Sequence, residues 1–124
     1  MNMTVVIAAG GAFGALLRYW VSIGVHQLAG SNFPYGTLTA NVVGSLLMGA
    51  LYVLLIERMD VDPMWRGALL IGLLGAFTTF STFSVETLNL VENGEPLKAL
   101  VNVAASVVLC IAACWAGMVA GRQI

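Results

Sequence analysis

The sequence predicts an all-α membrane protein with four transmembrane helices, and three observations support this class. Hydrophobic residues make up 60% of the 124 residues, and charged residues make up only 9%. The mean hydropathy is +0.94, whereas a soluble domain carries charge on about 25% of its residues. The chain also contains four long apolar runs, and a helix needs only about 20 apolar residues to cross the hydrocarbon core.

The four runs are expected to form one transmembrane domain over residues 1–124. Turn signals separate the runs, and the connections between them are too short for a second domain. Residues 1–4 carry no Lys or Arg, so the first run is expected to stay as a helix rather than be removed as a signal peptide. The predicted spans are residues 3–28, 37–56, 65–91 and 97–120.

Charge is scarce and nearly balanced between the two ends of the predicted bundle. The formal net charge of -1 is too small to indicate a nucleic-acid partner. The end that holds both termini has Arg58, Arg66 and Arg122, and the other end has Lys98. Because the asymmetry of Lys and Arg sets the orientation of a membrane protein, this small bias predicts insertion in both orientations, which is dual topology.

The first span combines small residues with one cation. Gly10 and Gly14 form a GxxxG step, which lets two helix backbones approach closely. Arg18 follows within the same span, and a charge at such a position is usually functional or paired. Two interpretations stay open: Arg18 lies at the mouth of a pore and raises the local anion concentration, or it reaches to the lipid headgroups.

The second and fourth spans each carry isolated polar side chains. Asn41 is a lone amide in an apolar segment, and it costs free energy there unless it finds partners. It is expected either to bond another helix or to face a permeating anion. In the fourth span Asn102, Ser106, Cys110 and Cys114 recur every four residues on one stripe. The two cysteines have no His or further Cys nearby, so neither a disulfide nor a metal site is expected.

The third span has a polar run in its middle. After Gly72 and Gly75, residues 78–84 consist only of Thr, Ser and Phe. Glycines and hydroxyl side chains permit a break in a membrane helix where protein or water satisfies the freed backbone groups. Such a break exposes carbonyl oxygens to a cation and amide hydrogens to an anion. The alternative is that the hydroxyls bond carbonyls one turn earlier and only bend the helix.

Two aromatic rings flank the centre of this run. Phe80 and Phe83 are three residues apart, with Ser81 and Thr82 between them. The edge of an aromatic ring carries partial positive charge, so it can contact a small anion without trapping it. Apolar packing of the two rings is the alternative.

With these motifs the sequence resembles the Fluc (CrcB) fluoride channels over essentially its full length. The run at residues 78–83 after Gly-x-x-Gly is the most specific part of the resemblance. The matching pieces are Gly10-Gly11-Ala12-Phe13-Gly14-Ala15, Arg18-Tyr19, Gly36-Thr37-Leu38, Asn41, Gly44-Ser45, Gly72 and residues 75–83.

The resemblance implies an antiparallel homodimer in the bacterial inner membrane. Such a dimer holds two fluoride pores and a central structural sodium ion, and it exports cytoplasmic fluoride passively, which gives fluoride resistance. The backbone carbonyls of Gly75 and Thr78 would bind the sodium, and Arg18 would lie in the vestibule. The pore residues carried over from the family are Asn41, Phe80, Ser81, Thr82, Phe83, Asn102 and Ser106. The sequence departs from the family at Cys110 and Cys114, where hydroxyls are common.

Two other functions compete with this interpretation. A small proton-coupled multidrug exporter has a similar size and topology, but it needs a carboxylate in the first helix, where this chain has Arg18 and no Asp or Glu. A non-transporting membrane scaffold subunit would explain Gly10 and Gly14 and leave Asn41 unused. An enzyme is not expected, because the sequence shows no nucleophile with a base, no metal cluster and no phosphate loop.

Overall fold

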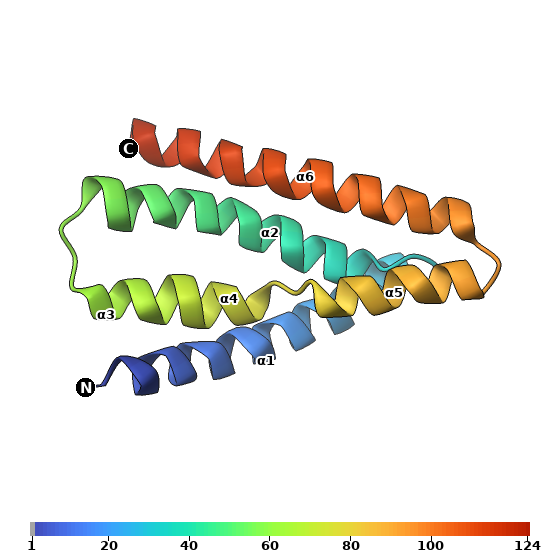
Figure 1. Ribbon diagram of the computed structural model, residues 1–124, viewed down its shortest axis with the longest axis horizontal. Coiled ribbons are helices and arrows are strands. Elements are labelled where there is room, and N and C mark those ends of the chain that lie inside the picture. Colours follow the sequence, from blue (N-terminus) through green and yellow to red (C-terminus); the bar gives the residue numbers. More distant parts are fainter. Residues whose placement is uncertain (1) are drawn as a thin grey trace.

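The computed structural model describes residues 2–124, and all regular structure within them is helical. Four helical spans are long and apolar enough to cross a membrane, which confirms the predicted fold class. They run alternately up and down, so the N- and C-termini lie at the same end (Figure 1). The four spans are Met3–Ala29, Tyr35–Arg58, Pro63–Glu92 and Pro96–Gln123, which extend at most three residues beyond the predicted ranges at either end.

Two spans are continuous α-helices and two are composite. The first span is α1 (Met3–Ala29), and the fourth is α6 (Pro96–Gln123). The second span is α2 (Tyr35–Tyr52) continued by the wider π-helical turn η1 (Val53–Arg58). The third span begins with α3 (Pro63–Arg66) and the π-helical η2 (Gly67–Leu73), and it continues through α4 (Leu74–Phe77) to α5 (Ser81–Glu92).

Local sequence accounts for where the helices start and stop. The Asn2 side chain accepts a hydrogen bond of 2.7 Å from the Thr4 amide and caps α1. Asp62 caps α3 in the same way through the Met64 amide, ahead of Pro63 at the first helical position. Gly30 ends α1 with φ +85°, a conformation that favours glycine. Pro96 is the first residue of α6, as Pro63 is the first residue of α3.

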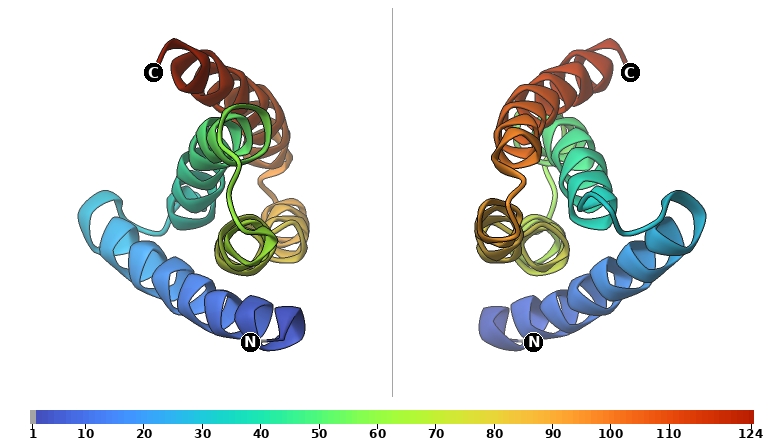
Figure 2. Two further views of the ribbon diagram at one scale, coloured as in Figure 1. Left: turned by 90° about the vertical axis from the view of Figure 1, so that its left-hand side faces the viewer. Right: turned by 90° about the vertical axis from the view of Figure 1, so that its right-hand side faces the viewer.

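In the end-on views α2 and the third span lie side by side between α1 and α6 (Figure 2). Glycines allow the close approach of α1 to the third span and of α2 to α6. A Cβ built at Gly14 would overlap the Leu73 carbonyl, and one built at Gly117 would overlap the Leu46 carbonyl. The GxxxG step of α1 therefore packs directly against the backbone of the third span, as its sequence predicts.

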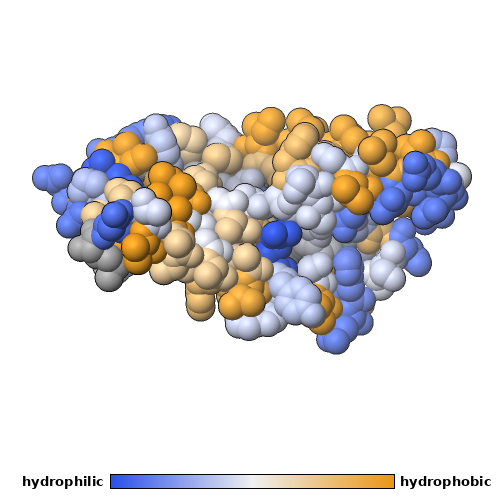
Figure 3. Space-filling model, turned by 60° about the horizontal axis from the view of Figure 1, so that its bottom comes forward, coloured by the Kyte–Doolittle hydropathy of each residue, from blue (hydrophilic) through white to orange (hydrophobic). Residues whose placement is uncertain are grey.

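The outer surface of the bundle is apolar along most of its length. On the face shown in Figure 3, hydrophobic side chains cover much of the stretch between the two ends. Most hydrophilic residues on this face lie toward the ends, with a hydrophilic spot near the middle. Residues such as Leu28, Ile111 and Trp115 are largely exposed. Contiguous apolar exposure on this scale marks a surface that lipid or another protein covers.

Candidate functional site

The polar run of the third span coincides with a stretch that is not helical. Helix α4 ends at Phe77 and α5 begins at Ser81, so Thr78, Thr79 and Phe80 lie between two helices. Thr78 adopts an extended backbone with φ -89° and ψ 159°. The Thr78 hydroxyl donates a hydrogen bond of 3.0 Å to the Leu74 carbonyl, which helps to close α4.

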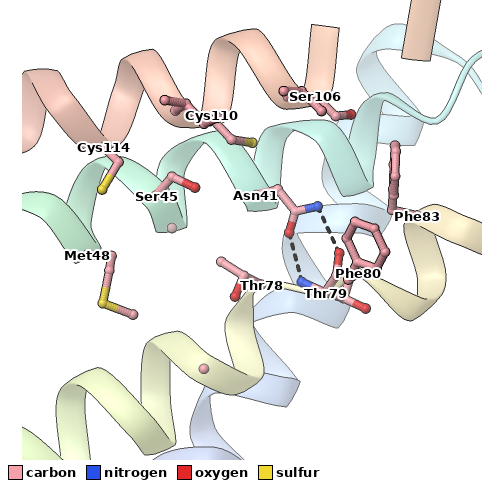
Figure 4. Close-up of a pocket in the computed structure, with 14 residues that line it drawn as sticks. Asn41, Ser45, Met48, Thr78, Thr79, Phe80, Phe83, Ser106, Cys110 and Cys114 are labelled. Carbon is pink, nitrogen blue, oxygen red and sulfur yellow. Dashed lines mark hydrogen bonds between the residues drawn. The ribbon is translucent and has the colours of Figure 1, made fainter. Parts of the chain in front are cut away.

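One side chain of α2 satisfies the backbone at the centre of this stretch. Asn41 Nδ2 donates to the Thr79 carbonyl at 2.9 Å, and Asn41 Oδ1 accepts from the Thr79 amide at 2.8 Å (Figure 4). A lone amide in a membrane helix needs such partners because water is absent. Gly44, one turn along α2, has no side chain and so leaves room for Phe77 and Thr78 to approach.

Arg18 of α1 bonds both sides of the non-helical stretch. Its Nε donates to the Ala76 carbonyl in α4 at 3.1 Å, and a terminal nitrogen lies 3.5 Å from the Thr82 hydroxyl in α5. Arg18, Thr82 and Glu86 line a cavity of about 230 Å³. Glu86 Oε1 is buried there without a hydrogen-bond partner among residues 2–124.

The non-helical stretch frees two backbone carbonyls from their usual helical bonds. In a continuous helix the Thr79 amide would bond the Gly75 carbonyl, but it bonds Asn41 instead. The Thr82 amide would bond the Thr78 carbonyl, but it donates to the Thr79 hydroxyl at 3.2 Å. Gly75 and Thr78 both line a second and larger cavity. Their carbonyl oxygens are therefore candidate ligands for a cation.

The large cavity has a volume of about 500 Å³ and lies between α2, the third span and α6. The aromatic rings of Phe80 and Phe83 line it, with their centroids 5.3 Å apart and their planes inclined by 48°. Phe83 is only 8% exposed, whereas Phe80 is 76% exposed. The two rings therefore differ: Phe83 is fixed by packing, and Phe80 stands at an open side of the cavity. The remaining side of the cavity is lined by Asn41, Ser45, Met48, Ser106, Cys110 and Cys114.

Six of the ten predicted site residues meet at this cavity. Arg18, Ser81, Thr82 and Asn102 do not, and Arg18 lines the smaller cavity. Asn102 is 2% exposed and donates to the Thr87 hydroxyl at 2.9 Å, while its Oδ1 lies 3.5 Å from the Ser106 hydroxyl. Thr82 faces the Arg18 cavity instead. Ser81 is exposed beside Thr79, with 3.3 Å between their hydroxyl oxygens.

The structure adds three residues to the predicted set. Thr79 holds the Asn41 amide, Thr87 anchors Asn102, and Met48 lines the cavity. Met48 carries a signal that the sequence offers, because it lies three residues after Ser45 and seven after Asn41 on one face of a helix. Thr87 gives no such signal, since its partner is in another span.

Comparisons with known proteins agree with one another. The profile of the family described as CrcB-like protein, Camphor Resistance (CrcB), matches residues 5–118. The chain is 48% identical over 125 residues to a fluoride-specific ion channel FluC of Coxiella burnetii, with full coverage of both chains. It is 46% identical over 124 residues to a protein of that name from Geobacter sulfurreducens, again with full coverage of both. A third protein of that name, from Methylococcus capsulatus, is 54% identical over 125 residues, and the chain spans 55% of its length.

Proposed function

The chain belongs to the CrcB-like family, and from that premise we propose that it is one subunit of a fluoride channel that exports cytoplasmic fluoride passively. The observation that carries the proposal is the cavity between α2, the third span and α6. Its lining combines an amide, two aromatic rings and hydroxyls, and none of its lining residues is charged. A conduction path must bind an ion weakly enough to release it, which neutral donors and ring edges allow.

The non-helical stretch between α4 and α5 would act as a functional break in the third span. Asn41 bonds both backbone groups of Thr79 within the stretch, and Arg18 bonds the Ala76 carbonyl in α4 just before it. The amino end of α5 carries partial positive charge from the helix dipole, which favours an anion nearby. In this arrangement Phe80, Phe83 and Ser106 contact fluoride, while Ser81 and Asn102 shape the wall around them.

Arg18 would have two roles in the channel. Its positive charge in the smaller cavity raises the local concentration of fluoride at the pore entrance. Its hydrogen bonds to Ala76 and the proximity of Thr82 also hold the two helices of the third span in register. Thr82 would then line the vestibule and help to position the Arg18 side chain.

The working channel would be an antiparallel homodimer with two pores, in the bacterial inner membrane. Phe80 lines the large cavity and is nevertheless 76% exposed, so one chain leaves the cavity without a wall on that side. A second copy of the chain would supply the missing wall. The small difference in Lys and Arg between the two ends favours insertion of copies in both orientations.

A sodium ion would join the two chains at the break. The residues fit such an ion, because the carbonyls of Gly75 and Thr78 are released from their helical partners. Hard cations prefer oxygen ligands, and an ion on a two-fold axis receives equal sets from both chains. The ion would supply positive charge at the interface and no chemistry of its own.

Fluoride and chloride efflux from liposomes, read with ion-selective electrodes, tests the channel. The native chain should release fluoride rapidly without chloride, and Phe80→Ile should release neither, because an aliphatic side chain lacks the positive ring edge. Phe13→Ile is the matched control, since Phe13 lies on α1 outside the lining of the large cavity. The absence of fluoride flux from folded native protein would return the exporter and scaffold functions to first place.

A further inference from the structure

Three sulfur-bearing side chains line the large cavity. Cys110 and Cys114 come from α6 and Met48 comes from α2, and all three are half-buried in its lining. Both cysteines are free thiols. Figure 4 shows the Cys114 and Met48 sulfur atoms at one end of the cavity and the Cys110 sulfur directed toward Asn41.

Close packing of α2 on α6 fixes the level at which these side chains meet. A Cβ built at Gly49 would overlap the Cys114 carbonyl, so the two backbones touch there. Met48 precedes Gly49 directly and is therefore held beside Cys114. The two cysteines are four residues apart on one helix face, where Cβ atoms are about 5 to 6 Å apart. Rotation about the Cα–Cβ bonds brings both thiols within reach of one ion.

We propose that Cys110, Cys114 and Met48 form a binding site for a soft monovalent cation such as Ag⁺ or Cu⁺. Thiolate and thioether sulfurs select soft metals, whereas hard cations prefer oxygen. Within residues 2–124 no group of three or more His, Cys, Asp or Glu is placed to hold a metal. The third ligand is a thioether from another helix, which is why the spacing of the cysteines does not reveal the site.

The charge balance of the site favours a monovalent ion. On binding, one S–H bond breaks, its proton goes to the buffer and a silver–sulfur bond forms. The second thiol and the Met48 thioether then donate lone pairs without losing a proton. The product is neutral, so burying it inside the membrane avoids the cost of an unpaired charge.

Silver binding to the purified full chain in detergent micelles tests the site directly. Silver nitrate is titrated in chloride-free buffer, and bound metal, free thiols and released protons are measured. We expect one Ag⁺ per chain, one proton released and both thiols protected. Cys110→Ser and Cys114→Ser should each weaken binding roughly 100-fold, and Met48→Leu should weaken it about tenfold.

Met59→Leu is the matched control and should bind silver like the native chain, because Met59 is exposed outside the cavity lining. Serine is nearly the same size as cysteine, so the variants should fold. Undiminished binding by both serine variants, or two independently bound ions per chain, would overturn the site.

The consequence for flux rests on the proposed fluoride channel. Ag⁺ in the cavity should block fluoride efflux of the native chain, whereas efflux of the Cys110→Ser/Cys114→Ser variant should stay close to that variant's own rate without silver. Failure of the untreated native chain to conduct would count against the channel alone, because the binding titration stands without it. Full conduction with silver bound would show that the metal lies off the fluoride path.

Discussion

The two halves of the third span are held to the bundle by different kinds of contact. In the first half, η2 packs backbone to backbone on α1 through Gly10 and Gly14. The second half, from Thr78 to Glu92, receives side-chain hydrogen bonds from Asn41, Asn102 and Arg18. The first half therefore depends on the absence of side chains, and the second depends on specific polar partners. The position of the first half is thus set by backbone packing, and the conformation of the second half is set by a few hydrogen bonds.

The strongest test of this contrast is a side chain added to the glycine contact. Gly14→Val should destabilise the protein by about 3 kcal/mol or more, because the new Cβ would overlap the Leu73 carbonyl and the backbones must separate. Unfolding in denaturing detergent, followed by tryptophan fluorescence, measures the change. Gly24→Val is the matched control, since nothing lies within 4 Å of a Cβ at Gly24 in the same helix. Equal stability of the two variants would contradict the backbone contact.

An effect of the same order is expected from removing the amide that holds the second half. Asn41→Leu leaves both the amide and the carbonyl of Thr79 without their partner, and each unsatisfied group costs about 1 to 3 kcal/mol. Asn41→Asp in its neutral form keeps an acceptor for the Thr79 amide and one O–H donor for the Thr79 carbonyl, so its loss of stability should be smaller than that of Asn41→Leu. Hydrogen exchange at the Thr79 amide should accelerate in Asn41→Leu and much less in Asn41→Asp. Unchanged hydrogen exchange in both variants would show that the Asn41 side chain does not hold the Thr79 backbone.

The two halves also differ in how far sequence alone predicts them. The GxxxG step of α1 is a local pattern, and its close packing follows from the size of Gly10 and Gly14. The composition of residues 78–84 likewise indicates the segment that lies between α4 and α5. The hydrogen-bond partners are a different matter, because Asn41 bonds a residue 38 positions away. Such a pairing depends on the rotation and level of each helix, which tertiary packing sets.

The fourth span shows the same limit at the site itself. The stripe from Asn102 to Cys114 predicts one polar face of a helix, and Ser106, Cys110 and Cys114 do line the cavity. Asn102 instead is buried against Thr87 of α5. The period of the stripe is a property of α6, whereas the partner of each residue depends on which neighbour it meets along the helix. Met48 joins the thiols for the same reason, through the α2 contact at Gly49.

The smallest expected effect comes from the hydrogen bond between Asn102 and Thr87. A hydrogen bond between membrane helices contributes about 0.6 kcal/mol on average, so this bond by itself should stabilise the protein by about that much. The Thr87 hydroxyl also donates to the Phe83 carbonyl at 2.7 Å in its own helix, so Asn102→Ala leaves it satisfied. A double-mutant cycle of Asn102→Ala and Thr87→Val should give a coupling near about 0.6 kcal/mol. A coupling of zero would mean that packing alone joins α5 to α6. A coupling as large as the loss of stability expected for Asn41→Leu would mean that Asn102 also fixes the conformation of the second half.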